Sequence, residues 1–266
     1  MRTVALAAVL GFLLATPASA DWVKLDDFEG DLSAWTTTGL AGGSGIVADP
    51  DDAGNKALFV DDPGAESVVA NLYLDLGSDD VATGVTGTLF GRMRAGASLE
   101  GVFGLSAELA PDEWGDMSTL TAYRRSSSDF TWQAHDGSYE DLDQQPATEV
   151  WINFWVVADN PNDVYHFYYT TTYGEDAELL SDNMTHTTTD DTFAFRGGAG
   201  ANALQTLVVR GSGYTTGGFY LDDFYIDSGS QNLSNPLASV PEPGTLLLLG
   251  TAALGLIGTV RKKRLG

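Results

Sequence analysis

The sequence predicts an all-β protein, an antiparallel β-sandwich, between two terminal segments that lie outside the fold. Short runs of strand-forming residues follow one another, Gly, Asn, Asp and Pro separate them, and no apolar stretch between Trp22 and Asp227 keeps a helical period. We expect one domain, residues 21–227, without internal repeats. The runs that we expect to form strands are Ala57–Val60, Ser67–Asp75, Gly87–Ala95, Val102–Glu108, Ser118–Arg125, Thr131–His135, Val150–Ala158, Val164–Thr172, Ala203–Arg210 and Gly218–Asp227.

Two turns between these runs are well signalled. Phe130–His135 is followed by Asp136-Gly137, a strong two-residue hairpin signal because both central positions need a positive φ. Trp151–Val157 reaches a turn rich in Asp and Asn and returns as Val164–Tyr169. We expect these two hairpins to form the middle of the sandwich. Both faces of Trp151–Val157 are apolar or aromatic, so we expect one face in the core and the other along a groove.

The first twenty residues have the features of a secretory signal peptide. Arg2 precedes the apolar run Val4–Leu14, and small residues in Pro17–Ala20 form a cleavage site just before Asp21. The apolar run is too short to span a membrane comfortably. We therefore expect residues 1–20 to form a signal helix that signal peptidase removes.

The other end of the chain has the features of a single transmembrane helix. About sixteen residues without charge, Thr245–Val260, precede Arg261, Lys262, Lys263 and Arg264. At about 1.5 Å per residue this helix covers roughly 24 Å of a hydrocarbon layer of about 30 Å, so it must stand nearly upright. The four basic residues form a membrane stop and hold their end in the cytoplasm, which places the domain on the other side of the membrane.

Residues 240–266 resemble the PEP-CTERM sorting signal, in which Pro-Glu-Pro, a short apolar helix and a basic cluster end an exported chain. Pro241, Glu242 and Pro243 are the matching motif, after a polar linker that we expect at residues 228–239. The resemblance implies sorting by an exosortase, a membrane protease of Gram-negative bacteria that make exopolysaccharide. It implies a transient inner-membrane anchor with the domain in the periplasm, followed by the cell surface or extracellular matrix. A permanent single-span anchor is the alternative.

Composition excludes several classes of function. Residues 21–239 hold eight Lys and Arg against thirty-six Asp and Glu, and such a surface repels nucleic acid and anionic lipid. Absence of cysteine removes disulfides, thiol catalysis and the usual zinc and iron–sulfur sites. Gly-x-Ser-x-Gly and His-Glu-x-x-His motifs are absent, and the three histidines are scattered. We expect no nucleic-acid partner and no catalytic site.

Several segments of the domain resemble jelly-roll carbohydrate-binding modules and concanavalin A-like, or laminin-G-like, sandwiches. Asp26–Trp35 is similar to their opening strand and Phe219–Ile226 to their closing strand, and Asp49–Leu58 and the hairpin at Trp151 fit the same families. The resemblance implies a jelly roll and leaves open whether it is concanavalin A-like or galactose-binding-like.

The same resemblance implies a structural calcium ion (Ca2+) where the first and last strands meet. Calcium takes six to eight oxygen ligands, mostly from carboxylates and carbonyls. The residues that the resemblance assigns to it are Glu29, Asp222 and Asp223. The alternative is two solvated acidic strand edges, which discourage pairing with other strands.

Four aromatic residues are candidates for sugar binding, which needs exposed rings beside polar groups. Trp114 lies in a polar segment, and Tyr123, Trp132 and Tyr139 lie on or beside the Asp136-Gly137 hairpin. The hypothesis is that at least one of the four contacts glycan. Packing in the core is the alternative for each, and Trp132 faces either the core or a groove.

These features predict an exported, non-catalytic surface or matrix protein that binds glycan or exopolysaccharide. The rival hypothesis is a secreted glycoside hydrolase on a concanavalin A-like sandwich, which would need two carboxylates about 5 to 10 Å apart. Glu140, Asp141 and Asp143 come closest to a clustered strand motif but do not match the Glu-x-Asp-x-x-Glu pattern of sandwich-fold glucanases. A third hypothesis is a structural module that binds only its neighbours.

Overall fold

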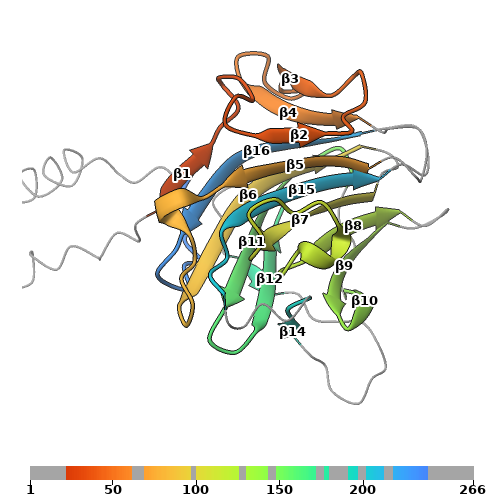
Figure 1. Ribbon diagram of the computed structural model, residues 1–266. Coiled ribbons are helices and arrows are strands. Elements are labelled where there is room, and N and C mark those ends of the chain that lie inside the picture. Colours follow the sequence, from red (N-terminus) through yellow and green to blue (C-terminus); the bar gives the residue numbers. More distant parts are fainter. Residues whose placement is uncertain are drawn as a thin grey trace, which may run out of the picture. The chain divides into compact units, whose positions relative to one another are not determined.

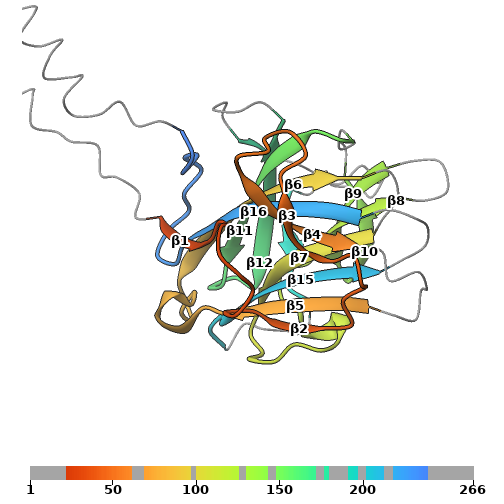
Figure 2. The ribbon, with the colours of Figure 1, turned by 90° about the horizontal axis from the view of Figure 1, so that it is seen from above.

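The chain folds into two antiparallel β-sheets packed face to face, as the computed structural model shows (Figures 1 and 2). The prediction of an antiparallel β-sandwich is confirmed. The chain divides into two units, Met1–Pro236 and Leu237–Gly266, and the sandwich belongs to the first. The structure describes residues 22–61, 69–96, 100–125, 130–142, 148–171, 177–179, 191–196, 202–212 and 218–238.

Sheet A has nine strands, in the order β13-β12-β11-β6-β16-β4-β3, with β1 paired to β16 and β14 paired to β12. Its long central strands lie between shorter edge strands. The bounds are β1 Val23–Asp26, β3 Gly45–Ala48, β4 Lys56–Asp61, β6 Thr86–Ala95, β11 Trp151–Asp159, β12 Val164–Thr170, β13 Glu178–Leu179, β14 Phe193–Ala194 and β16 Gly218–Asp227.

Sheet B has seven strands, in the order β10-β9-β8-β7-β15-β5-β2. Two short 3-10 helices, η1 Gly77–Asp79 and η2 Trp114–Asp116, lie in the connections. The bounds of the strands are β2 Thr36–Thr38, β5 Val69–Asp75, β7 Glu100–Ser106, β8 Thr121–Arg125, β9 Phe130–Asp136, β10 Ser138–Asp141 and β15 Thr206–Ser212.

Each of the ten predicted runs overlaps one strand of the structure, and both predicted hairpins are present. β9 returns as β10 through Gly137, whose φ is +74°, and β11 returns as β12 after Asp163, whose φ is +58°. β11 lies inside sheet A, between β6 and β12, as expected. β10 is an edge strand of sheet B, so the expectation that both hairpins form the middle was wrong for the first.

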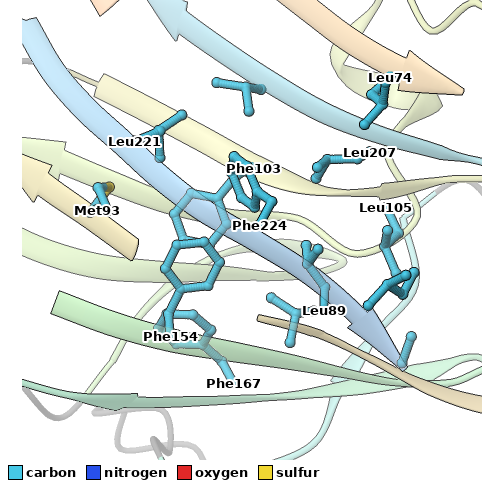
Figure 3. Close-up of a cluster of buried hydrophobic side chains, with 14 of the residues drawn as sticks. Leu74, Leu89, Met93, Phe103, Leu105, Phe154, Phe167, Leu207, Leu221 and Phe224 are labelled. Carbon is cyan, nitrogen blue, oxygen red and sulfur yellow. The ribbon is translucent and has the colours of Figure 1, made fainter. Parts of the chain in front are cut away.

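The core lies between the two sheets and is rich in aromatic rings. Phe103 on β7 stacks on Phe154 on β11 with ring centroids 4.1 Å apart, and Phe154 meets Phe224 on β16 edge-on (Figure 3). Gly91 on β6 leaves room for these rings, because a Cβ there would lie 2.5 Å from Phe154 and 2.7 Å from Phe224. Alternation along each strand thus supplies one inward face per sheet.

The segment that follows β16 covers part of the outer face of sheet A. Trp155 donates through Nε1 to the carbonyl of Ser234 at 3.1 Å, and Trp22 donates through Nε1 to Ser234 Oγ at 3.0 Å. The backbone N–H of Asn232 donates to Thr88 Oγ1 at 2.9 Å. We call residues 228–236 the strap. The folded unit therefore continues past the boundary expected at residue 227, and at Trp155 the outer face of β11 is covered.

Candidate functional site

The predicted sorting segments lie outside the described residues. These are the signal peptide, the motif Pro241-Glu242-Pro243, the expected transmembrane helix and the membrane stop at Arg261–Arg264. Within the described part of the chain, no helix is long and apolar enough to cross a membrane.

The residues that the resemblance assigned to calcium are engaged with protein groups. Glu29 Oε1 accepts the backbone N–H of Lys56 at 2.8 Å. Asp223 Oδ2 accepts from Arg92 Nη1 at 2.9 Å, and Asp222 Oδ2 accepts from Asn55 Nδ2 at 2.9 Å and lies 3.6 Å from Arg92 Nη1. Among the described residues, no group of three or more His, Cys, Asp or Glu side chains could hold a metal ion.

The Arg92 guanidinium pairs with Asp223 and lies 3.6 Å from Asp222, so these aspartates and Glu29 could hold a calcium ion only by giving up their present partners. Asp222 is only 1% exposed, and burial together with the charge of Asp223 raises its pKa to about 7. Burial also raises the pKa of Asp223, while the hydrogen bond from Arg92 opposes that change.

Trp132 was wrongly predicted as a glycan-binding residue, because the structure places it in the core. Its side chain is fully buried and packs on Phe167 and Phe103, with ring centroids 5.0 and 6.1 Å away. It has no exposed face on which a sugar ring could stack. Tyr123 is the strand partner of Trp132 across β8 and β9, and its side chain lies outside the described part of the chain.

Trp114 and Tyr139 come together on the outer face of sheet B. Both are half-buried and pack, with Tyr73, against a small apolar cluster formed by Val102, Met117, Leu120, Ala122 and Val208. An arginine side chain packs against each ring. The Arg210 guanidinium lies 4.7 Å from the Trp114 ring centroid, and Arg196 lies 5.8 Å from the Tyr139 ring and donates through Nη1 to its hydroxyl at 3.2 Å.

The connection between β7 and β8, residues 107–120, holds Trp114 in this position. We call it the covering segment. It approaches β7 closely because Gly104 has no side chain; a Cβ there would lie 1.7 Å from the carbonyl oxygen of Thr119. Asn71 Nδ2 and Arg210 Nη2 donate to the carbonyls of Pro111 and Asp112 at 2.9 and 3.0 Å.

Within the covering segment, the turn that carries Trp114 is capped at its N-terminal end. Asp116 Oδ2 accepts the backbone N–H groups of Asp112 and Glu113, each at 2.9 Å, and a reciprocal contact from Glu113 completes a capping box. Trp114 is therefore held on a fixed backbone.

Strand register places six side chains from six strands in one row beside Trp114 and Tyr139. We call it the polar row: Asn71, Arg210, Val102, Ala122, Gln133 and Asp141, from β5, β15, β7, β8, β9 and β10. Its centre is apolar and both of its ends are polar. At one end Gln133 Nε2 donates to Asp141 Oδ1 at 2.6 Å.

Four buried polar atoms of this row have no hydrogen-bond partner among the described residues: Asn71 Oδ1, Gln133 Oε1, and Nε and Nη1 of Arg210. Their residues are only 4%, 8% and 4% exposed. Burial lowers the pKa of Arg210, against the opposing charges of Asp116 and Asp112. An unsatisfied buried polar group costs about 1–3 kcal/mol, so four of them, three at the Asn71–Arg210 end of the row and one at Gln133, call for an explanation such as a bound ligand.

Sequence reasoning found Trp114 and Tyr139 but missed Asn71, Arg210 and Gln133. These three residues meet through strand pairing between segments far apart in the chain. One feature of the sequence could have pointed to this site: Arg210 is a charged residue at the end of Ala203–Arg210, a predicted strand that is otherwise mostly apolar.

Residues 239–264 match the model of the PEP-CTERM protein-sorting motif, which indicates an exported protein. No curated protein sequence matches this chain. Two solved lectin structures are similar in fold: lectin UEA-II complexed with galactose, with a TM-score of 0.52, and lectin II from Ulex europaeus, with 0.51. Each is 7% identical over 78% of this chain and 98% of its own.

A carbohydrate esterase from the Shiga toxin-encoding bacteriophage phi24B is also similar, at 13% identity and a TM-score of 0.46, over 75% of this chain and 92% of its own. The lectins show that the sandwich has the fold of known carbohydrate-binding domains.

Proposed function

We propose that this chain, with its PEP-CTERM motif and lectin-like sandwich, is a non-catalytic surface or matrix protein that binds exopolysaccharide. An exosortase would recognise the motif at Pro241-Glu242-Pro243 after export, and the basic cluster would stop the chain in the inner membrane until processing. The match over residues 239–264 supports this route.

The observation that carries the binding proposal is the polar row beside Trp114 and Tyr139. A sugar has an apolar ring face, which stacks on aromatic rings, and hydroxyl groups, which both donate and accept hydrogen bonds. The row offers donors on Arg210 and acceptors on Asn71 and Gln133. Because these atoms are buried, binding to them requires a local displacement of Pro111 and Asp112, whose carbonyls Asn71 and Arg210 hold, while the capped turn keeps Trp114 in place.

The rival hypothesis, a glycoside hydrolase, needs two carboxylates that face a substrate. At this site Asp141 accepts from Gln133, and Asp116 accepts from two backbone N–H groups of its own turn. Both carboxylates have structural partners, which favours binding over hydrolysis. Release of reducing ends from a bound polysaccharide would instead support the hydrolase.

The test measures binding of the detergent-solubilised full-length protein to a panel of polysaccharides. We expect Trp114→Ala to weaken binding at least tenfold without a large change in melting temperature. Leu109→Ala is the matched control, since Leu109 lies in the same covering segment and is 59% exposed. Equal binding by wild type and Trp114→Ala would remove this site from the proposal.

A further inference from the structure

A second set of half-exposed aromatic side chains lies on the outer face of the other sheet. Strand register places Phe59, Tyr220, Arg94 and Trp151 side by side, one each from β4, β16, β6 and β11. We call them the aromatic row. All four are half-buried, and the core includes their strand neighbours Leu58, Val60, Met93, Ile152, Phe219 and Leu221. With strands about 4.8 Å apart, the row extends over about 14 Å.

The rings of this row are fixed before any ligand arrives. Phe59 and Tyr220 pack with ring centroids 4.8 Å apart, and the Arg94 guanidinium lies 5.9 Å from the Tyr220 ring. Trp151 donates through Nε1 to Asp49 Oδ1 at 3.1 Å, and Arg92 lies 4.6 Å from its ring. A rigid set of rings loses little conformational entropy on binding.

The strap leaves this end of sheet A uncovered. Its hydrogen bonds include those with Trp22, Thr88, Trp155, Tyr168 and Asp227. Along β6 and β11, Arg94 and Trp151 lie at the opposite ends from Thr88 and Asp159. The aromatic row and the strap therefore occupy different parts of the same face.

Charge indicates which kind of polymer this surface accepts. The two arginines beside the rings are neutralised locally: Arg94 Nε lies 3.3 Å from Asp51 Oδ2, and Arg92 pairs with Asp223 at 2.9 Å. The chain as a whole carries a formal net charge of −24. An anionic polysaccharide would be repelled by such a surface, whereas a neutral one would not.

We propose that the aromatic row is a second binding site, for an extended neutral polysaccharide that lies across β4, β16, β6 and β11. Tyr220 and Trp151 are two strands apart, about 10 Å, and present stacking surfaces to successive parts of such a chain. The inference rests on the proposed function, because it treats the sandwich as a glycan-binding module, but it uses the opposite sheet. With one site on each sheet, one molecule holds two polysaccharide chains and cross-links them.

The experiment compares single-site variants of the detergent-solubilised full-length protein. Electrophoresis is run in gels containing galactomannan or hydroxyethylcellulose, which are neutral, or polygalacturonate, which is anionic. We expect retardation in the neutral gels and none in the anionic gel. Tyr220→Thr should weaken retardation at least tenfold. Val23→Thr is the matched control, because Val23 lies on β1 of the same sheet and is 39% exposed.

Turbidity of protein mixed with galactomannan tests the cross-linking. Wild type should cloud the solution, and Tyr220→Thr and Trp114→Ala, which each keep one site, should bind more weakly and without clouding it. Phe59→Thr is the second variant if Tyr220→Thr lowers the melting temperature. Unchanged retardation of both aromatic-row variants would overturn this inference. If Trp114→Ala then lost all binding, the proposed function would stand without the second site. Loss in Tyr220→Thr alone would support the second site and remove the first.

Discussion

The two outer faces of the sandwich differ in how their polar groups are satisfied. On sheet A, Arg92 pairs with Asp222 and Asp223, and Asp49 accepts from Trp151, so the charged groups hold one another in place, although Arg92 Nε is buried without a partner in the described residues. On sheet B, Arg210 and Asn71 retain buried atoms without partners in the described residues.

This difference implies two modes of recognition on one scaffold. The face of sheet A offers ring surfaces with its charges already paired, so binding there would depend on stacking. The face of sheet B offers unused hydrogen-bonding capacity beside two rings, so binding there would depend on directed hydrogen bonds. Variants that act on one face alone should therefore change binding at that face only. A variant of the shared core should change binding at both faces together.

The largest expected effect is at Trp132, in the core that both faces share. Trp132→Ala should lower the free energy of unfolding by about 3–5 kcal/mol and reduce binding to every polysaccharide together. Trp114→Ala should lower the free energy of unfolding far less, because Trp114 is half-buried. Chemical denaturation of both variants checks this. Similar losses for the two tryptophans would contradict the placement of Trp132.

Trp132 also shows what could be predicted from the sequence and what could not. The strands and the Asp-Gly turn are local features, and alternation correctly put Trp132 and Ala134 on one face of β9. Which face is inward depends on the partner sheet, where Phe167 on β12 packs against Trp132, beside Phe103 on β7 of its own sheet. Strand pairing, not local pattern, decides that question.

The next effect concerns the pH dependence of stability at Asp222. Its pKa in the folded state, about 7, lies above the ordinary value of 3.8, so the folded protein binds this proton more tightly than the unfolded chain does. The contribution of Asp222 to stability is therefore most favourable below about pH 4 and declines as the pH rises to about 7.

Asp222→Asn removes this titration while keeping an acceptor for Asn55. We expect the variant to gain stability relative to wild type as the pH rises from about 4 to about 7. Urea denaturation at several pH values measures it. The matched control is Asp52→Asn, since Asp52 is exposed. A difference between Asp222→Asn and wild type that does not change with pH would contradict the raised pKa.

The pairing of Asp222 with Arg92 could not be predicted from the sequence. The side chains of Arg92 and Asp223 lie 131 residues apart in the chain, and they meet only because β6 and β16 are neighbours in sheet A. The resemblance placed the two aspartates correctly on the closing strand but could not show that an arginine lies opposite them.

A smaller effect, confined to sheet B, is expected at Gly104. Gly104→Ala places a Cβ against the Thr119 carbonyl and should push the covering segment away, at a cost of about 1–3 kcal/mol. Polysaccharide binding at Trp114 should fall while retardation through the aromatic row persists. Gly115→Ala is the matched control, since a Cβ there would have nothing within 4 Å. Equal loss at both sites would show that the faces are not independent.

The smallest expected effect is that of calcium on the melting temperature. A ligand that binds only the folded state stabilises it by mass action, so a calcium site would appear as a rise in melting temperature at millimolar calcium. Arg92 pairs with Asp223 and lies 3.6 Å from Asp222, and Glu29 accepts from the backbone of Lys56. A calcium ion at these carboxylates would have to displace the guanidinium, so we expect no more than a slight rise, with magnesium as the control. A clear rise with calcium alone that disappears in the Glu29→Ala, Asp222→Ala double variant would contradict this expectation and restore the calcium site that the resemblance implied.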